Sequence, residues 1–334
     1  CVSTATILLK GSPVSEERQQ EAFIMENLLK VEDIKIRKGM TVNEMIEAMG
    51  RSGGFTAPKL ADAVDIAEKM IRKEGCLKML SFPACIMATG TRGVIVDMVK
   101  NGMVDLIITT CGTLDHDLSR TWESYYRGDF DMDDEKLRDE CISRLGNVLV
   151  PDSCYGEVLE ENLAPMFEEI FKDTLSLSTH EIIDAVGARL DNEDSLLYQC
   201  HKKNIPIFVP GITDGSFGCQ LWMYYQTHRG LRVDLFKDEQ KLSEMTNDAK
   251  YTGAVIIGGG ISKHHVIWWN QFRGGLDYAI YMTTAQEFDG SLSGAKIKEA
   301  VSWGKVKADA SKMTVEGDAT IALPLLVAAL EERL

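Results

Sequence analysis

The stretch EAVSWGKVKAD, residues 299–309, combines residue types that could carry out amine chemistry. A lysine side chain normally has a pKa near ~10.4, so at neutral pH it is a cation and a poor nucleophile. Desolvation beside an indole lowers that pKa and supplies the free amine needed for a Schiff base, and Trp303 stands two residues before Lys305. Glu299 is placed to pair with a cationic substrate. The same pattern also fits a lysine at the start of a strand with its ammonium in solvent.

Three polar or glycine-rich turns follow apolar runs and supply further candidate groups. GGGISKHH, residues 258–265, fits a phosphate at a helix N-terminus, and equally a plain tight turn. LDHD, residues 114–117, suits ribose hydroxyls or an amine, and also suits an N-cap followed by the acids of a first helical turn. Asp214 in TDGSFG fits a ligand contact or an Asx turn.

The sequence gives no pattern for a metal centre. His264 and His265 are adjacent, so on a helix at most one of them faces a given site. The eight cysteines are scattered, with no CxxC pair and no His/Cys cluster at zinc-ligand spacing. We therefore expect no metal ion, and we interpret the cysteines as reduced thiols of a cytosolic protein.

Short Val- and Ile-rich runs alternate with helical patterns beyond Gly75. Such runs predict parallel strands that are covered on both faces, in a doubly wound α/β fold. Several runs end in polar or glycine-containing turns, which would line the ligand crevice at the carboxyl edge of the sheet. The predicted strands lie within residues 78–85, 104–112, 204–215, 253–265 and 276–284, with a last strand and helix in 312–334.

The region before the sheet reads as helical. A charged helical stretch is expected around residues 16–30. Residues 40–49 form a predicted helix with a capping box between Thr41 and Glu44. An amphipathic helix should follow Thr56.

The acidic, aromatic segment 121–140 is predicted to be an insertion or an interface element. We divide the chain into an N-terminal helical extension, residues 1–52, and one α/β domain, residues 53–334.

The bulk composition excludes some classes of function. A net charge of −15 argues against a nucleic-acid partner and is compatible with a basic partner or substrate. The start of the chain has no basic region and too short an apolar run for a signal peptide. No apolar segment approaches the ~18 residues of a membrane span.

Four linked segments resemble deoxyhypusine synthase: TTCGTLDHD (109–117), TDGSFG (213–218), GGGISKHH (258–265) and the run from Asp277 to Ala310 that contains EAVSWGK. The segments TCGTLDHDL, YYRGDFDMDDEKL and RLGNVLVP are similar to its archaeal branch. The resemblance implies a Rossmann-like domain that uses NAD to oxidise spermidine. The aminobutyl group then passes through an imine on an enzyme lysine to a lysine of translation initiation factor 5A. It also implies a cytoplasmic homotetramer with active sites at dimer interfaces.

The resemblance assigns roles to individual residues. Lys305 matches the imine-forming lysine, and His264 matches a histidine near the reacting carbon. The residues that match or flank polyamine contacts are Glu299, Trp303, Tyr281, Gly259, Asp115, His116, Gly290 and Ser291. The residues expected at NAD are Ala84, Cys85, Ala88, Thr110, Cys111, Gly112, Asp214, Thr284, Ala285, Asp318 and Ala319.

The chain departs from the eukaryotic pattern where the amine is held. Cys219 and Leu292 occupy positions that are acidic there, and His116 replaces a glutamate. Each lost charged contact is worth roughly 1.5–3 kcal/mol, enough to change which amine binds. Asp115, Asp117 or Glu299 would have to compensate. Two alternatives therefore stay open: aminobutyl transfer to a small diamine, as in homospermidine synthases, and a catalytically weak NAD-binding subunit that completes a partner's site.

Overall fold

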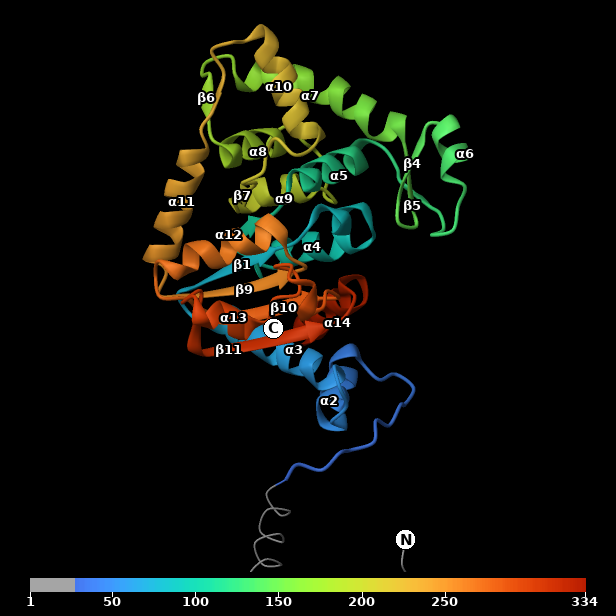
Figure 1. Cartoon of the computed structure of the whole chain (residues 1–334), viewed down its shortest axis with the longest axis vertical. Coiled ribbons are helices and arrows are strands. Elements are labelled where there is room, and N and C mark those ends of the chain that lie inside the picture. Colours follow the sequence, from blue (N-terminus) through green and yellow to red (C-terminus); the bar gives the residue numbers. More distant parts are fainter. Residues whose placement is uncertain (1–27) are drawn as a thin grey trace, which may run out of the picture.

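A computed structural model describes residues 28–334, and its centre is a parallel β-sheet (Figure 1). In the described part of the chain this sheet has six strands in the order β11-β10-β9-β1-β2-β7, and every neighbouring pair is parallel. The strands are β1 (Cys76–Ser81), β2 (Leu106–Ile108), β7 (Ile207–Phe208), β9 (Tyr251–Ile257), β10 (Leu276–Thr283) and β11 (Val306–Glu316).

This strand order confirms the predicted doubly wound fold. The chain runs outward from β1 to β2 and β7, then returns to the other side of β1 and continues through β9, β10 and β11. The direction reverses between β1 and β9, and ligands of doubly wound sheets bind at the carboxyl ends of the strands at such a reversal.

Helices cover both faces of the sheet because successive strand residues point to opposite sides. In β1, for example, Met79 and Leu80 belong to different apolar clusters. One face is covered by α3 (Ala57–Arg72), α4 (Thr91–Lys100) and α14 (Ala319–Arg333). The other is covered by α11 (Leu235–Asp248), α12 (Gly260–Gln271) and α13 (Ile297–Ser302).

The N-terminal helix forms where the sequence predicted it. α2 (Val42–Ser52) begins with the capping box in which Thr41 accepts from the Glu44 backbone N–H while the Glu44 carboxylate accepts from the Thr41 N–H. Ile46 of α2 is fully buried and belongs to the same core as α3 and α14. The domain boundary predicted after residue 52 therefore directly follows a helix that packs on the α/β core. The division of the chain into an extension and a domain stays a prediction.

The helix expected around residues 16–30 lies almost wholly outside the described residues. Residues 28–41 contain no helix and are mostly exposed.

A second group of helices gathers at the end of the molecule opposite α2 (Figure 1). It includes α5 (Cys111–Trp122), α7 (Gly156–Ile170), α8 (Thr179–Gly187), α9 (Leu196–Lys203) and α10 (Ser216–Thr227). A small parallel pair, β6 (Ser176–Leu177) and β8 (Arg232–Val233), joins this group.

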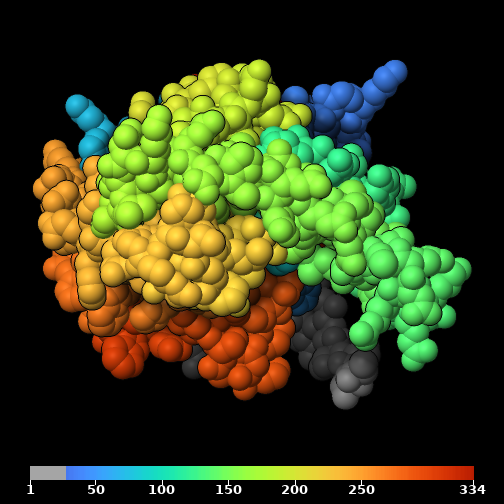
Figure 2. All heavy atoms as spheres, turned by 90° about the horizontal axis from the view of Figure 1, so that it is seen from above, coloured from blue at the N-terminus to red at the C-terminus, as the bar shows by residue number. Residues whose placement is uncertain are grey.

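The acidic segment predicted as an insertion forms part of a separate antiparallel sheet. This sheet has the order β3-β5-β4 and comprises β3 (Tyr126–Arg127), β4 (Ile142–Leu145) and β5 (Val148–Pro151). α6 (Asp134–Asp139) lies beside it, and the unit projects from the body of the molecule (Figure 2).

Two further findings bear on the sequence expectations. All seven cysteines in residues 28–334 are free thiols. Within the same residues, no helix combines the length and the apolar character needed to cross a bilayer.

Candidate active site

Lys305 is fixed in place by its backbone between α13 and β11. Its N–H donates to the Ala300 carbonyl at 2.9 Å, and its carbonyl accepts from the Leu276 N–H at 3.1 Å. Gly304, with a φ of 67°, supplies the left-handed turn that redirects the chain from the helix into the strand. The sequence Trp-Gly-Lys therefore gives Lys305 one defined position at the start of β11.

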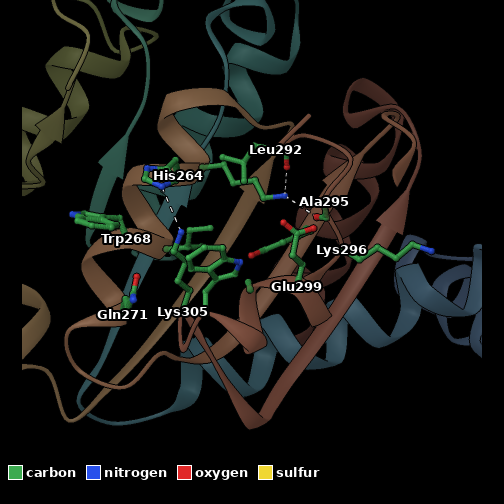
Figure 3. Close-up of a pocket in the computed structure, with 13 residues that line it drawn as sticks. His264, Trp268, Gln271, Leu292, Ala295, Lys296, Glu299 and Lys305 are labelled. Atoms are coloured by element: carbon green, nitrogen blue, oxygen red, sulfur yellow. Dashed lines mark hydrogen bonds between the residues drawn. The ribbon is translucent and has the colours of Figure 1, made fainter. Parts of the chain in front are cut away.

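The Lys305 amine points toward His264, which lies on α12 (Figure 3). The Nζ of Lys305 and the Nε2 of His264 are 3.5 Å apart. Partial burial, and then the positive charge of Lys305, lower the pKa of His264. A neutral imidazole at this distance can take a proton from the amine.

Two indoles flank the Lys305 amine. Nζ lies 5.4 Å from the ring centroid of Trp303 and 5.9 Å from that of Trp268. The sequence predicted the first contact. Trp303 is 62 % exposed in the single chain, however, so it is an open wall and does not enclose the lysine.

The amine opens into a cavity of about 390 Å³ between α12, α13 and β10. Tyr281 of β10 forms part of its lining and is almost fully buried. Among the described residues that line this Lys305 pocket, Glu299 is the only carboxylate, and it comes from α13. Within the described residues, this chain therefore offers a single carboxylate to a cationic ligand in the pocket.

Lys263 is the buried lysine of the pocket, and the sequence reasoning missed it. It is 1 % exposed and donates from its ammonium to the carbonyls of Leu292 and Ala295 at 2.6 and 3.0 Å (Figure 3). Burial lowers the pKa of Lys263 to about 8, while the charge of Glu299 opposes the shift.

Trp268 and Gln271 were also missed, although a sequence signal for them exists. They follow His264 by four and seven residues, so the three side chains form one stripe along α12. His265 instead faces Glu239, with 3.4 Å between Nε2 and Oε1. This confirms that only one of the adjacent histidines faces the pocket.

A second cavity, of about 710 Å³, lies at the carboxyl edge of the sheet, where the strand order reverses. It is bordered by the turns that follow β1, β2, β9, β10 and β11. Of the residues predicted at the cofactor or substrate, it brings together Cys85, Thr110, Gly259, Thr284, Ala285, Asp318 and Ala319.

The N-terminus of α12 opens into this crevice. Its cap residue is Gly259, and no side chain among residues 28–334 caps the first N–H groups of the helix. Free N–H groups and the helix dipole favour a phosphate at such a position. Both the size and the donors of this cavity fit a dinucleotide.

The two cavities are neighbours. Leu292 lines the Lys305 pocket, and the next residue, Ser293, lines the crevice. The loop 284–296 therefore forms the partition between them. Gly259 packs so closely on this loop that a Cβ there would lie 2.4 Å from the Cα of Ser293.

Asp115 was expected near the amine, but its carboxylate serves the fold. It is fully buried and accepts from the backbone N–H groups of Ser216 and Phe217 at 2.9 and 2.7 Å, and from the Tyr155 hydroxyl at 2.8 Å. These contacts cap the N-terminus of α10. The idea that Asp115 compensates for the missing carboxylates has no support in this geometry.

Asp117 is also engaged in the fold. It is paired with Arg92 at 2.7 Å and accepts from the N–H groups of Leu196 and Leu197 at the start of α9. It is therefore not available to a ligand in this arrangement.

Other predicted residues lie outside both cavities. Burial lowers the pKa of His116 to about 4, and this side chain lines a third cavity beside β4, β5 and α7. Ala88 and Cys111 are buried, and Asp214, Gly290 and Ser291 are exposed. Ala84 and Gly112 pack against each other where α5 meets η1 (Ala84–Ala88). The roles of these residues stay predictions.

Comparison with known proteins identifies the family. The family model "Deoxyhypusine synthase" matches residues 44–330. The chain belongs to the deoxyhypusine synthase family. The comparisons support this interpretation rather than the homospermidine one.

Proteins named "Probable deoxyhypusine synthase" from two archaea are close relatives. The one from Picrophilus torridus is 53 % identical over 298 residues, which is 89 % of this chain and 96 % of the relative. The one from Thermoplasma acidophilum is 51 % identical with the same coverage.

A crystal structure described as "a putative deoxyhypusine synthase from Entamoeba histolytica" has a similar fold. Its TM-score is 0.64 at 21 % identity, over 90 % of this chain and 96 % of that one. The predicted resemblance is confirmed.

Proposed function

We propose that this enzyme is a deoxyhypusine synthase that transfers the aminobutyl group of spermidine to one lysine of translation initiation factor 5A, with NAD as cofactor. The observation that carries the proposal is the position of Lys305. Its amine lies 3.5 Å from a histidine, in a pocket that a single loop separates from a dinucleotide-sized crevice.

We assign NAD to the crevice at the carboxyl edge of the sheet. The uncapped N-terminus of α12 would hold the pyrophosphate, and Thr284, Asp318 and their neighbours would line the rest. NAD supplies the reversible oxidation that makes a carbon of the polyamine electrophilic. The chain's own residues perform the transfer.

Lys305 is the nucleophile in this proposal. It must lose a proton before it can attack, and the neutral Nε2 of His264 is placed to accept that proton. Nζ then bonds to the imine carbon of the oxidised substrate, and the bond from that carbon to the departing amine breaks. The acceptor lysine of the factor would repeat this exchange and free Lys305, and return of the hydride removed from the donor would reduce the resulting imine to the amine product.

The remaining pocket residues hold the cationic substrate. The carboxylate of Glu299 would pair with an ammonium group, and the face of Trp303 would cover the methylene chain. Tyr281 closes the floor, and its hydroxyl is buried with no partner among residues 28–334. A polyamine N–H would satisfy that oxygen.

The proposal extends to assembly and location. Trp268, Phe272 and Trp303 are 41, 59 and 62 % exposed around the pocket mouth, as expected if a second subunit covers the site in a homotetramer. The free cysteines favour the reducing cytoplasm. Light scattering of the purified protein tests the tetramer.

The proposed function is tested by trapping the covalent intermediate. The protein is incubated with NAD and spermidine without acceptor, reduced with borohydride and mapped by peptide mass spectrometry. An aminobutyl adduct on Lys305 is expected, and it should be absent from the Lys305→Arg variant. Lys312→Arg, at a half-buried lysine of β11 that lines neither cavity, is the matched control and should form the adduct normally. An adduct on another lysine, or none while NAD binds, would contradict the proposal.

A further inference from the structure

The stripe of α12 that faces the Lys305 pocket carries two residues to which the mechanism above gives no role. Trp268 and Gln271 lie one turn apart and line the cavity beside His264 (Figure 3). Both project from a helix packed on the sheet, so their positions are set by the fold. The question is what chemistry this wall offers to a ligand.

Trp268 presents an aromatic face to a cation. The Lys305 ammonium lies between its ring and that of Trp303, 5.9 and 5.4 Å from the two centroids. The Trp268 ring stacks on His264 with centroids 5.7 Å apart, and it meets Phe272 edge to face at 5.3 Å. These contacts restrain the indole, which leaves a fixed surface where an ammonium group is attracted to the ring.

Gln271 adds an oxygen that lacks a partner. Its Oε1 is buried and accepts no hydrogen bond from any group in residues 28–334. A buried carbonyl oxygen without a donor is costly, and a ligand N–H in the pocket would remove that cost. The same helix turn therefore offers a cation-binding face and a hydrogen-bond acceptor.

The charges around the pocket show why such a neutral site matters. Lys263, Lys296 and Lys305 line it, and Glu299 is the only carboxylate among the described lining residues; Lys296 is paired with Glu287, which lies outside the lining, at 2.6 Å. Leu292 presents an apolar side chain to the same space. The lining of the Lys305 pocket therefore attracts an amine mainly through its aromatic rings and the Gln271 amide oxygen, while its apolar side chains contact the methylene groups of the ligand.

We infer that Trp268 and Gln271 form a neutral amine subsite that selects the polyamine donor. One ammonium group of the donor binds against the Trp268 ring and donates a hydrogen bond to the Gln271 oxygen. These two neutral groups take the place of a carboxylate that would otherwise bind the amine. The inference rests on the proposed function, because it concerns the donor of that reaction. Charge pairing contributes little to such a site, so donor binding should depend weakly on salt.

The test measures spermidine binding without NAD, by calorimetry, so that no chemistry intervenes. The variants are Trp268→Leu, Gln271→Leu and Gln271→Glu, each at 50 and 300 mM salt. Phe236→Leu, which removes an exposed aromatic ring of α11 away from both cavities, is the control. NAD binding and unfolding midpoints verify that each variant is folded.

Trp268→Leu is expected to weaken spermidine binding about threefold to thirtyfold, the range of one cation–π contact. Gln271→Leu should weaken it by about tenfold to 150-fold, the loss of one hydrogen bond to a charged group. Gln271→Glu should tighten binding at low salt and make it clearly salt-dependent. In adduct formation, both leucine variants should raise KM with kcat within about threefold.

Two results would overturn the subsite. One is wild-type spermidine affinity in both leucine variants. The other is a lower kcat at unchanged KM, which would place these residues in the chemistry instead. Failure of the proposed function is distinguishable, because it appears as a missing Lys305 adduct in the wild-type protein.

Discussion

The ammonium of Lys263 donates a hydrogen bond of 2.6 Å to the carbonyl oxygen of Leu292 and so ties α12 to the loop 284–296. A second bond reaches the Ala295 carbonyl, and the ring of Tyr281 lies 4.2 Å away. Two N–H groups of the ammonium thus have carbonyl partners, and its charge faces an aromatic ring. Because this loop divides the two cavities, Lys263 holds the partition between the proposed cofactor and Lys305.

Replacing Lys263 by Met should change how stability depends on pH. Burial lowers the pKa of Lys263 from 10.5 to about 8, so between these values the unfolded chain binds more protons than the folded one. The free energy of unfolding therefore rises with pH across this window, by up to about 3 kcal/mol, and the full cost of the buried charge is present below pH 8. Lys263→Met lacks this rise. Denaturant unfolding of both proteins at pH 7.5 and 10 measures the difference, and an equal rise in both would show that Lys263 does not cause it.

Gly259→Ala should disturb both cavities at once. The added Cβ would lie 2.4 Å from the Cα and 2.6 Å from the backbone nitrogen of Ser293, so the partition has to move. We expect NAD affinity and the rate of adduct formation each to fall by about tenfold or more, because small displacements of a reacting geometry are costly. Gly93→Ala in α4 is the matched control, since its Cβ meets nothing within 4 Å. That variant should keep full activity and gain up to about 1 kcal/mol of stability. Equal activity of the two variants would mean that the loop 284–296 can shift to accommodate the added Cβ without loss of function.

Asp115→Ala should reduce stability and leave donor binding unchanged. The substitution removes the cap of α10 and the acceptor of the Tyr155 hydroxyl. The expected loss is about 2–4 kcal/mol of unfolding free energy, the sum of a helix cap and a buried charged hydrogen bond. Urea unfolding measures that loss, and calorimetry measures spermidine binding by the folded protein. Weaker spermidine binding at near-normal stability would instead show that Asp115 contributes to the substrate site.

Local patterns in the sequence were enough to predict the sheet and the capping box of α2. The run from Gly253 to Ile257, for example, has no polar side chain and is buried throughout, because it belongs to a central strand covered on both faces. The Lys305 environment was predicted only in part. Trp303 is a neighbour in sequence, and Gln271 shares a helical stripe with His264, whereas Lys263 reaches the pocket because α12 packs across the sheet beside the loop 284–296, which no local pattern encodes. The structural role of Asp115 was not predicted for a related reason: its partners Ser216 and Phe217 are about a hundred residues away, and an acid that caps a distant helix has the same local signature as one that binds a ligand.

His264→Gln should slow adduct formation without abolishing it. Glutamine keeps a polar group near Lys305 but cannot take its proton, and loss of a general base typically costs about 10²-fold or more. The deficit should shrink as pH rises, because hydroxide and solvent then remove the proton that His264 accepts at neutral pH. His265→Gln is the control: His265 faces Glu239 and lies outside the pocket, so the folded variant should react at the wild-type rate. Single-turnover adduct formation from pH 6.5 to 9.5 measures both variants. A deficit in His264→Gln that stays constant with pH would show that the imidazole positions the substrate and does not accept the proton.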